Sequence, residues 1–429
     1  MNEPDAVTII ARAPDSFLNS GHLPTLIACL LYFDASFMVW VLLGPLAPFL
    51  SEDLKLTAAQ KGMMVAVPLL GGALFRPIMG VLGDLLGGRR AGMLGLGLTL
   101  LPLVIGWRFA KHLHDFYAVG ILLGIAGASF AVALPLAGSW YPPEHQGLAM
   151  GIAGAGNSGT LVATLFAPRL AQAFGWPKTF ALAMLPVFVV FVLFGLMARN
   201  NPLRAAAKLG WRDYAAVMRE PDTGWFCFFY SFTFGGFVGL ASFLTIFFHD
   251  QYLLPKVRAG DFTTIVVVAG SFLRPVGGWL ADKIGGYRLL LILLSGLSCC
   301  LAGVGTLPSL PMVVVLLFVA MGMLGMGNGA VFQLVPQRFS QRVGVLTGLV
   351  GAAGGLGGFA LPSILGAVKD RTGQYGLGLF LFAAAFLLAA LVLLQLGSVW
   401  RTTWSSPSVE RAGIFCYRSF ARSWVSSEN

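Results

Sequence analysis

Charged residues are scarce in this sequence. Asp, Glu, Lys and Arg make up 11% of the 429 residues, against roughly 25% in soluble domains, and 57% of the residues are hydrophobic. The mean hydropathy is +0.80. A soluble protein of this size could not bury so much apolar surface. The composition therefore excludes a soluble globular domain and predicts a polytopic, all-α membrane protein.

Signatures of catalysis and of metal binding are also missing. The chain has no Ser/His/Asp set, no HExxH motif and no GK[ST] after its glycine-rich runs, and its five cysteines form no CxxC pair. The net charge of +10 could suggest nucleic acid, but the basic residues form no continuous patch and mostly separate apolar runs. We therefore expect no enzyme activity, no metal, no cofactor and no nucleic-acid partner.

Long apolar runs with short polar loops between them make up most of the chain. They fall at roughly 25–50, 62–84, 91–110, 116–140, 146–171 and 178–198, and again at 224–248, 261–282, 288–307, 311–336, 343–367 and 376–398. Each run is long enough to cross the hydrocarbon core as a helix. We predict twelve transmembrane helices in two six-helix bundles, 25–198 and 223–398, joined by a polar linker, 199–222.

The two tails and the linker set the expected orientation. The tail 1–24 has no basic start followed by an apolar stretch, so we expect no cleaved signal peptide. Lys and Arg are more frequent in the loops on the side of the two termini, above all in the linker. This excess predicts that both termini lie in the cytoplasm and that the chain spans the cytoplasmic membrane. The tail 399–429 is rich in Ser and Arg, and we expect it to be disordered or to lie on the inner membrane surface.

A motif at the end of the second run recurs at the end of the eighth. Residues 75–90 read FRPIMGVLGDLLGGRR, and residues 273–288 read LRPVGGWLADKIGGYR. The matched positions are Arg76, Pro77, Gly80, Asp84, Gly87, Gly88 and Arg90 in the first copy, and Arg274, Pro275, Gly278, Asp282, Gly285, Gly286 and Arg288 in the second. Self-similarity over half the chain predicts that the two bundles are pseudo-symmetric.

Each copy of the motif places one arginine well inside an apolar run. Arg76 lies eight residues before Asp84, and Arg274 has the same spacing from Asp282. About 12 Å of helix therefore separates each arginine from the membrane edge. An arginine at that depth costs roughly 2.5–3.5 kcal/mol on insertion scales. Because a planar guanidinium offers a fork of donors to planar oxygens, we interpret the pair as an anion site.

A structural alternative is that a buried carboxylate neutralises each arginine. Asp34 is the one acid that lies within a predicted span and away from its ends. Two positive charges therefore face at most one negative partner inside the membrane, which favours the anion site. Asn157 is also notable, because a primary amide in so apolar a run as GIAGAGNSG needs a hydrogen-bond partner.

The shape G-x-x-x-D-x-x-G-G-R-R resembles the loop signature of the major facilitator superfamily. Narrower features resemble the nitrate/nitrite porter family: the paired arginines, the runs GIAGAGNSG (151–159) and GLVGAAGGLGGFALP (348–362), and the segments FMVW (37–40), GASF (127–130) and FYSFTFGGF (229–237). The resemblance covers about residues 25–398. It implies two bundles that rock around a central site, and nitrate, together with nitrite, as the substrate of a monomeric carrier.

Seven side chains are assigned to the anion by this resemblance. Arg76 and Arg274 would bind its charge, and Asn157 and Tyr230 would donate hydrogen bonds to it. The apolar walls would be Phe37, Phe130 and Phe234. Helix packing is the alternative role of the last five. Sugar carriers need more polar spans than these, and carriers of cationic drugs favour a buried acid, but another small anion stays open as the substrate. A membrane-embedded nitrate sensor without transport is a further alternative, although it would not need the paired loop motifs.

Five charged residues at the bundle ends are predicted to form a conformational latch: Asp84, Arg89, Arg90, Asp282 and Arg288. Charged pairs there would hold the outward-facing state closed on the cytoplasmic side and would break on opening.

Proton coupling needs a group that gains a proton together with the anion. No histidine lies near mid-depth, so Asp34 is the candidate. Anion binding would cancel the charge of a nearby arginine and so let Asp34 take up a proton. The FRPIMGVLGD form of the second run resembles the proton-coupled branch of the family and favours symport, whereas exchange of nitrate for nitrite would need no such group.

Overall fold

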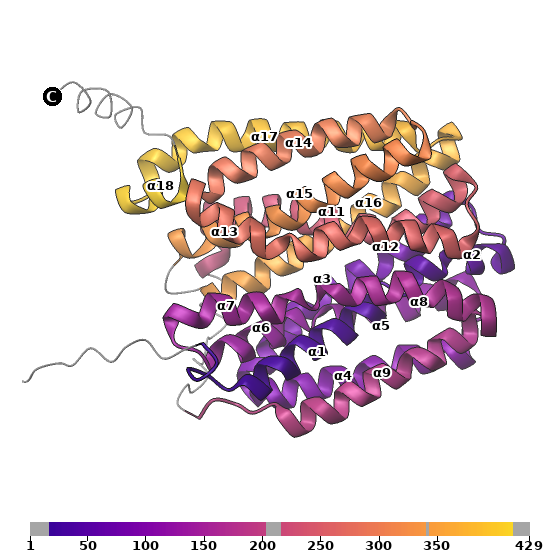
Figure 1. The fold of residues 1–429 in the computed structure, drawn as a ribbon, viewed down its shortest axis with the longest axis horizontal. Coiled ribbons are helices and arrows are strands. Elements are labelled where there is room, and N and C mark those ends of the chain that lie inside the picture. Colours follow the sequence, from indigo (N-terminus) through magenta and orange to yellow (C-terminus); the bar gives the residue numbers. More distant parts are fainter. Residues whose placement is uncertain (1–16, 203–215, 340–342, 415–429) are drawn as a thin grey trace, which may run out of the picture.

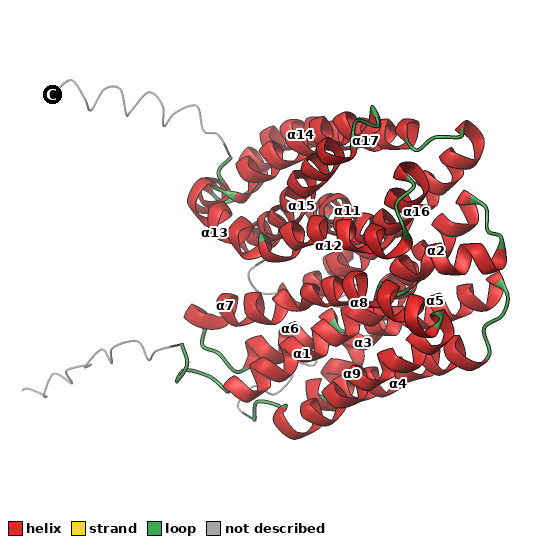
Figure 2. Ribbon diagram, turned by 45° about the vertical axis from the view of Figure 1, so that its right-hand side comes forward, coloured by secondary structure: helices red, strands yellow, loops and turns green. Residues whose placement is uncertain are grey.

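The computed structural model describes residues 17–202, 216–339 and 343–414, and every regular element in these ranges is a helix (Figure 2). The first half holds α1 (Leu23–Trp40), α2 (Leu43–Leu54), α3 (Ala58–Leu86), α4 (Gly88–Arg108), α5 (Leu113–Gly127), α6 (Phe130–Ser139), α7 (Pro143–Gly154), the 3₁₀ turn η1 (Ala155–Ser158), α8 (Gly159–Phe174) and α9 (Trp176–Met197). The second half holds α11 (Pro221–Tyr252), α12 (Lys256–Phe272), α13 (Arg274–Ile284), α14 (Gly286–Gly305), α15 (Leu310–Arg338), α16 (Val343–Thr372), α17 (Gly376–Thr403) and α18 (Ser406–Ala412).

These helices form 12 membrane spans in two six-helix bundles, which confirms the predicted fold. In Figure 1 the N-terminal bundle, in indigo to magenta, lies beside the C-terminal bundle, in orange to yellow. We call the end of the molecule that holds the start of α1 and the end of α17 the tail end. The opposite end, where α2 meets α3 and α11 meets α12, is the far end.

Four spans are interrupted near their middle, between α1 and α2, between α5 and α6, at η1 and between α12 and α13. Proline explains two of the breaks, because it has no N–H for the carbonyl four residues earlier. Pro45 cannot donate to the Val41 carbonyl, which instead accepts from Gly44 N at 2.9 Å in a tighter turn. Pro275 ends α12 and makes Arg274 the first residue of α13. Interrupted spans of this kind often line transport sites.

The repeated motif forms the same turn in both halves. Gly87 and Gly285 have φ of +80° and +90° and separate α3 from α4 and α13 from α14. A side chain would be strained there, so glycine is required at this point of each copy.

The two bundles are joined at the far end by ion pairs. Lys61 of α3 lies 2.5 Å from Asp250 of α11, and Arg169 of α8 lies 2.6 Å from Asp261 of α12. Lys256 of α12 also pairs with Glu52 of α2.

A carboxylate and a close helix approach complete this far-end contact. Asp370 of α16 accepts from the Ala58 and Ala59 amides at 2.8 and 3.0 Å and so caps α3 from the other bundle. Gly260 of α12 packs so tightly on α8 that an added Cβ would come within 2.7 Å of the Thr164 carbonyl oxygen.

At the tail end, the described residues of the two bundles are less closely packed than at the far end. A Cβ added at Gly147, Gly151, Gly278 or Gly348 would meet no atom within 4 Å. These glycines lie on α7, α13 and α16; the other halves of the spans that contain α7 and α13, which are α8 and α12, contact each other across the bundle interface. The structure is therefore closed at the far end and separated at the tail end.

Residues 399–414 are ordered, so disorder, one of the two alternatives expected for the tail, was wrong for this part of it. The helix α17 continues through Thr403, and α18 packs on α15 and α14. Trp400 is fully buried, and its indole N–H donates to Asp222 at 2.8 Å, as that of Trp404 does at 3.1 Å. Arg338 lies 2.5 Å from the same carboxylate. The remainder of the predicted tail, with Trp424, lies outside the described residues.

Candidate anion-binding site

Arg76 lies at the contact between the two bundles. Its side chain is 1% exposed and projects from the middle of α3. Nε donates to the Gly127 carbonyl of its own bundle at 3.0 Å, and one terminal nitrogen donates to the Gly351 carbonyl of α16 in the other bundle. The second terminal nitrogen, Nη2, is buried and has no hydrogen-bond partner among the described residues. Arg76 therefore bridges the bundles and still has a free donor.

Arg274 approaches the same place from the opposite bundle. Its guanidinium carbon lies 5.7 Å from the centre of the Phe130 ring, and 4.0 Å from where a Cβ of Gly154 would be. Phe130 and Gly154 belong to the N-terminal bundle, so this arginine also crosses the interface. Its Nη1 atom is buried without a hydrogen-bond partner in the described chain. The sequence prediction that the two arginines converge is consistent with this geometry.

Aromatic rings surround the guanidinium group of Arg76. The ring centres of Phe234 and Phe130 lie 4.8 and 5.6 Å from its guanidinium carbon. Trp40, which the sequence interpretation did not assign to the site, lies at 5.2 Å. Phe37 stands one layer further out, 6.3 Å from Phe234 and 5.0 Å from Trp40. Such faces attract a cation without neutralising its charge.

Tyr230 connects the aromatic group to both arginines. Its ring stacks on Phe234 at 5.1 Å with an interplanar angle of 3°. Its hydroxyl is buried and lies within electrostatic reach of Arg274 and Arg76. Phe332 of α15 closes this side, with ring centres 5.1 Å from Tyr230 and 6.1 Å from Phe130. The sequence interpretation did not assign Phe332 to the site, because no local pattern marked it.

Asn157 is held in η1, where the glycine-rich run interrupts the fifth span. Its side chain is fully buried, and neither its amide nitrogen nor its oxygen has a hydrogen-bond partner among the described residues. The expected need for a partner is thus not met by the protein itself. A buried polar group without a partner costs about 1–3 kcal/mol. An anion that accepts from this amide would remove that cost.

No carboxylate neutralises the arginines in the part of the chain that the structure describes. Neither Arg76 nor Arg274 has an Asp or Glu oxygen within 4.0 Å. Asp34 instead accepts from the Ser158 hydroxyl at 2.6 Å. The alternative of two structural ion pairs therefore has no support in this structure. Two buried positive charges with free donors are suited to one small oxyanion.

The predicted latch residues all lie at the tail end. Asp84 is near the end of α3 and Asp282 near the end of α13, while Arg89 and Arg90 begin α4. Arg288 is in the first turn of α14. The ion pairs Lys61–Asp250, Arg169–Asp261 and Lys256–Glu52, which join the bundles, lie at the far end and involve none of these positions. Their pairing as a latch therefore stays a prediction.

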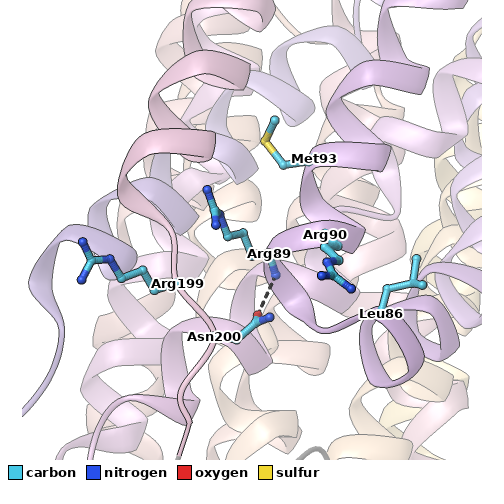
Figure 3. A pocket seen from close by; sticks show the side chains of 6 residues that line it. All are labelled: Leu86, Arg89, Arg90, Met93, Arg199 and Asn200. Atoms are coloured by element: carbon cyan, nitrogen blue, oxygen red, sulfur yellow. Dashed lines mark hydrogen bonds between the residues drawn. The ribbon is translucent and has the colours of Figure 1, made fainter.

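A basic pocket of about 590 Å³ lies beside two of these arginines (Figure 3). It is lined by Leu86, Arg89, Arg90, Met93, Arg199 and Asn200. Arg89 is turned toward α9, where it donates to the Gly195 carbonyl at 2.5 Å, and its amide is capped by Asn200 at 2.9 Å. The pocket is at the tail end of the N-terminal bundle, away from Arg76 and Arg274, so it is not the predicted anion site.

Comparison with known proteins gives the wider context. Residues 28–362 match the Major Facilitator Superfamily. The chain is 37% identical over 365 residues to the nitrite extrusion protein of Bacillus subtilis, covering 84% of this chain and 90% of that protein. It is 34% identical to a probable nitrate/nitrite transporter of Mycobacterium tuberculosis, over 82% of this chain and 91% of the relative.

Two further matches concern exchange and fold. A probable nitrate/nitrite antiporter of Thermus thermophilus is 30% identical, with 85% of this chain and 88% of the relative covered. Among solved structures, a D-xylose–proton symporter superposes with a TM-score of 0.73 at 15% identity, over 86% of this chain and 97% of that one. At so low an identity, the last match speaks for the fold alone.

Proposed function

The chain belongs to the nitrate/nitrite porter family of the Major Facilitator Superfamily, and on that premise we propose that it transports nitrate, together with nitrite, across the cytoplasmic membrane. It is a carrier and not an enzyme. The observation that carries the substrate proposal is the arginine pair. Arg76 and Arg274 come from opposite bundles, each keeps a buried nitrogen without a partner, and no carboxylate of the described chain balances their charge. A planar anion would supply the acceptors that both forks lack.

Alternating access is supported by the different state of the two ends. We place the tail end in the cytoplasm, because basic residues are concentrated there, and this makes the far end external. With this orientation we infer an inward-facing state, and we propose that the carrier is a monomer. Bundles 25–198 and 223–398 would rock against each other, and the linker 199–222 would connect them. In the outward-facing state the latch residues Asp84, Arg89, Arg90, Asp282 and Arg288 would meet.

Six of the seven side chains assigned to the anion keep their proposed roles, and Phe37 moves to the layer behind them. The arginines bind its charge, Asn157 and Tyr230 donate hydrogen bonds, and Phe130 and Phe234 close the site above and below. Phe37 supports Phe234 and Trp40 in the layer behind them. Aromatic walls exclude water, and this exclusion strengthens the interaction between the guanidinium groups and the anion.

Coupling to protons is proposed to run through Asp34. This carboxylate receives a hydrogen bond from Ser158, the neighbour of Asn157 in η1. Binding of an anion to Asn157 would change the position of η1 and, through Ser158 in the same turn, the hydrogen bond to Asp34. We propose that Asp34 takes up a proton when the anion binds and releases it in the cytoplasm, so that nitrate is imported by symport. Exchange of nitrate for nitrite is the second candidate, because one relative bears the name of an antiporter.

Transport in proteoliposomes separates these proposals. Purified protein is reconstituted, and uptake of labelled nitrate is measured with an inward pH gradient, with internal nitrite, or with neither. Symport predicts accumulation driven by the pH gradient alone. Exchange predicts uptake that requires internal nitrite and does not respond to pH. Absence of nitrate uptake under all three conditions would contradict nitrate transport itself.

A further inference from the structure

Asn328 of α15 is a buried amide that the proposed mechanism does not use. Its side chain is fully buried, and neither its nitrogen nor its oxygen has a hydrogen-bond partner among the described residues. Asn157 is in the same condition in the other bundle. An amide cut off from water and from the protein lacks all of its hydrogen bonds, which indicates that its partner is a molecule absent from the chain.

The neighbours of Asn328 along α15 show which way its side chain points. Gly327 faces α11, since a Cβ there would lie 2.7 Å from Cγ2 of Thr233. Gly329 faces α13, since its Cβ would lie 2.7 Å from the Arg274 carbonyl oxygen. Successive residues of a helix are turned by about 100°, so the residue between these two points between α11 and α13. That direction leads toward the N-terminal bundle.

Phe332 confirms this direction independently. It lies four residues after Asn328, and residues at this spacing share one face of a helix. Its ring packs against Tyr230 and against Phe130 of the opposite bundle. The face of α15 that carries Asn328 and Phe332 is therefore the face turned to the anion site.

The depth of Asn328 also matches the site. Gly329, its neighbour, packs on the backbone of Arg274, and the Arg274 guanidinium lies over Phe130. The two halves of the sequence give the same placement, because ASFAVALP (128–135) in the fourth span corresponds to GAVFQLVP (329–336) in the tenth. Asn328 lies eight residues before Pro336, just as Gly127 lies eight before Pro135. Gly127 is the residue whose carbonyl accepts from Arg76 Nε.

We propose that Asn328 is a hydrogen-bond ligand of the transported oxyanion. It would be the amide ligand that the C-terminal bundle contributes, as Asn157 is that of the N-terminal bundle. This inference rests on the proposed anion transport. The side-chain NH₂ donates to an anion oxygen, and Oδ1 accepts from a donor of Arg274 or Tyr230 when the site closes. Nitrate has one oxygen more than nitrite and so offers acceptors to a larger set of donors. Loss of Asn328 should therefore cost nitrate more affinity than nitrite.

The test is a comparison of nitrate and nitrite affinities in the purified full-length protein by calorimetry. Asn328→Ala should weaken nitrate binding about 2- to 12-fold, the equivalent of one neutral hydrogen bond of about 0.5–1.5 kcal/mol, and nitrite binding by less. Asn328→Asp should abolish binding of both anions, because it places a carboxylate beside Arg274. If the Ala variant is not recovered folded, Asn328→Ser keeps one donor and should bind nitrate with intermediate affinity.

Gln333→Ala provides a matched control on the same helix. The Gln333 amide oxygen accepts from Gly286 N at 3.1 Å, so its loss should lower the melting temperature and leave both affinities unchanged. An Asn328→Ala variant with wild-type affinities would show a structural or hydrated amide and overturn the inference, while the proposed function would stand. Failure of the wild type to bind either anion would instead overturn both.

Discussion

Arg76 and Arg274 occupy matched positions in the two halves, yet their surroundings differ in how firmly they hold the guanidinium. Arg76 projects from an unbroken helix and donates to two backbone carbonyls, one in each bundle. Arg274 begins a helix after the break that Pro275 imposes, and its guanidinium carbon lies over the Phe130 ring and next to Gly154. The two halves therefore share the position of the positive charge but not the contacts that orient the guanidinium group.

This difference suggests a division of roles between the two arginines. Arg76 is oriented before any anion arrives, because its fixed bonds leave one free nitrogen directed at the site. Arg274 has fewer fixed partners, so an anion would order it and bring the C-terminal bundle closer. A preorganised donor lowers the entropy cost of binding, while a donor that is ordered on binding can couple it to motion.

Exchange of each arginine for lysine gives the largest expected effect. Arg76→Lys and Arg274→Lys keep the charge but lose the fork, and a lost charge-assisted hydrogen bond of about 1.5–3 kcal/mol weakens nitrate affinity about 10- to 150-fold. Transport should nearly cease in both variants. Only Arg76→Lys should also lower the melting temperature of the anion-free protein, because only Arg76 bridges the bundles through carbonyls.

Calorimetry of nitrate binding and a thermal melt without anion decide this point. Equal melting temperatures in the two variants would contradict the division of roles. Wild-type affinity in either variant would contradict the argument from the guanidinium fork.

The second prediction concerns an asymmetry of charge between the halves. The N-terminal bundle has Asp34 near the site, whereas α11 has no acid between Asp222 and Asp250. Asp34→Asn cannot take up a proton, so nitrate accumulation driven by an inward pH gradient should be lost. Counterflow of nitrate against nitrite should persist, because the arginines are unchanged. Intact pH-driven accumulation in this variant would remove Asp34 from the mechanism.

The third prediction compares the two ends. Asp370 caps α3 across the bundle interface, and replacement of a capping residue by Ala costs about 0.5–2 kcal/mol, so Asp370→Ala should shift the balance toward the outward-facing state about 2- to 30-fold. Spin labels at Lys55 and Gln374, both exposed, would report a longer far-end distance in a background without native cysteines.

Asp115→Ala is the control for this experiment. Asp115 accepts from the Lys111 and His112 amides at 2.9 and 2.8 Å, in the same kind of contact but within one bundle. Its loss should not change the measured distance. An equal response of the two variants would show that the cap itself, and not its position across the interface, determines the result.

The sequence predicted what depends on local pattern and repetition. Apolar runs marked the spans, and the repeated motif placed Arg76 and Arg274 at one depth. It did not predict the bond from Arg76 to the Gly351 carbonyl, which joins residues 275 positions apart and depends on how two bundles pack. Nor did it predict that Trp400 is buried on Asp222, because interfacial and buried tryptophans look alike in a sequence.

The smallest expected effect tests the neutral ligand of the N-terminal bundle. Asn157→Ala removes one hydrogen bond worth about 0.5–1.5 kcal/mol, so nitrate affinity should fall about 2- to 12-fold, less than for either arginine. The turn η1 ties this residue to Ser158 and Asp34, and the pH dependence of uptake should therefore change together with affinity. Ser158→Ala separates the two effects, because it removes the bond to Asp34 and leaves the amide. Unchanged affinity in Asn157→Ala, measured by calorimetry, would make Asn157 a packing residue and leave the site with charged ligands only on that side.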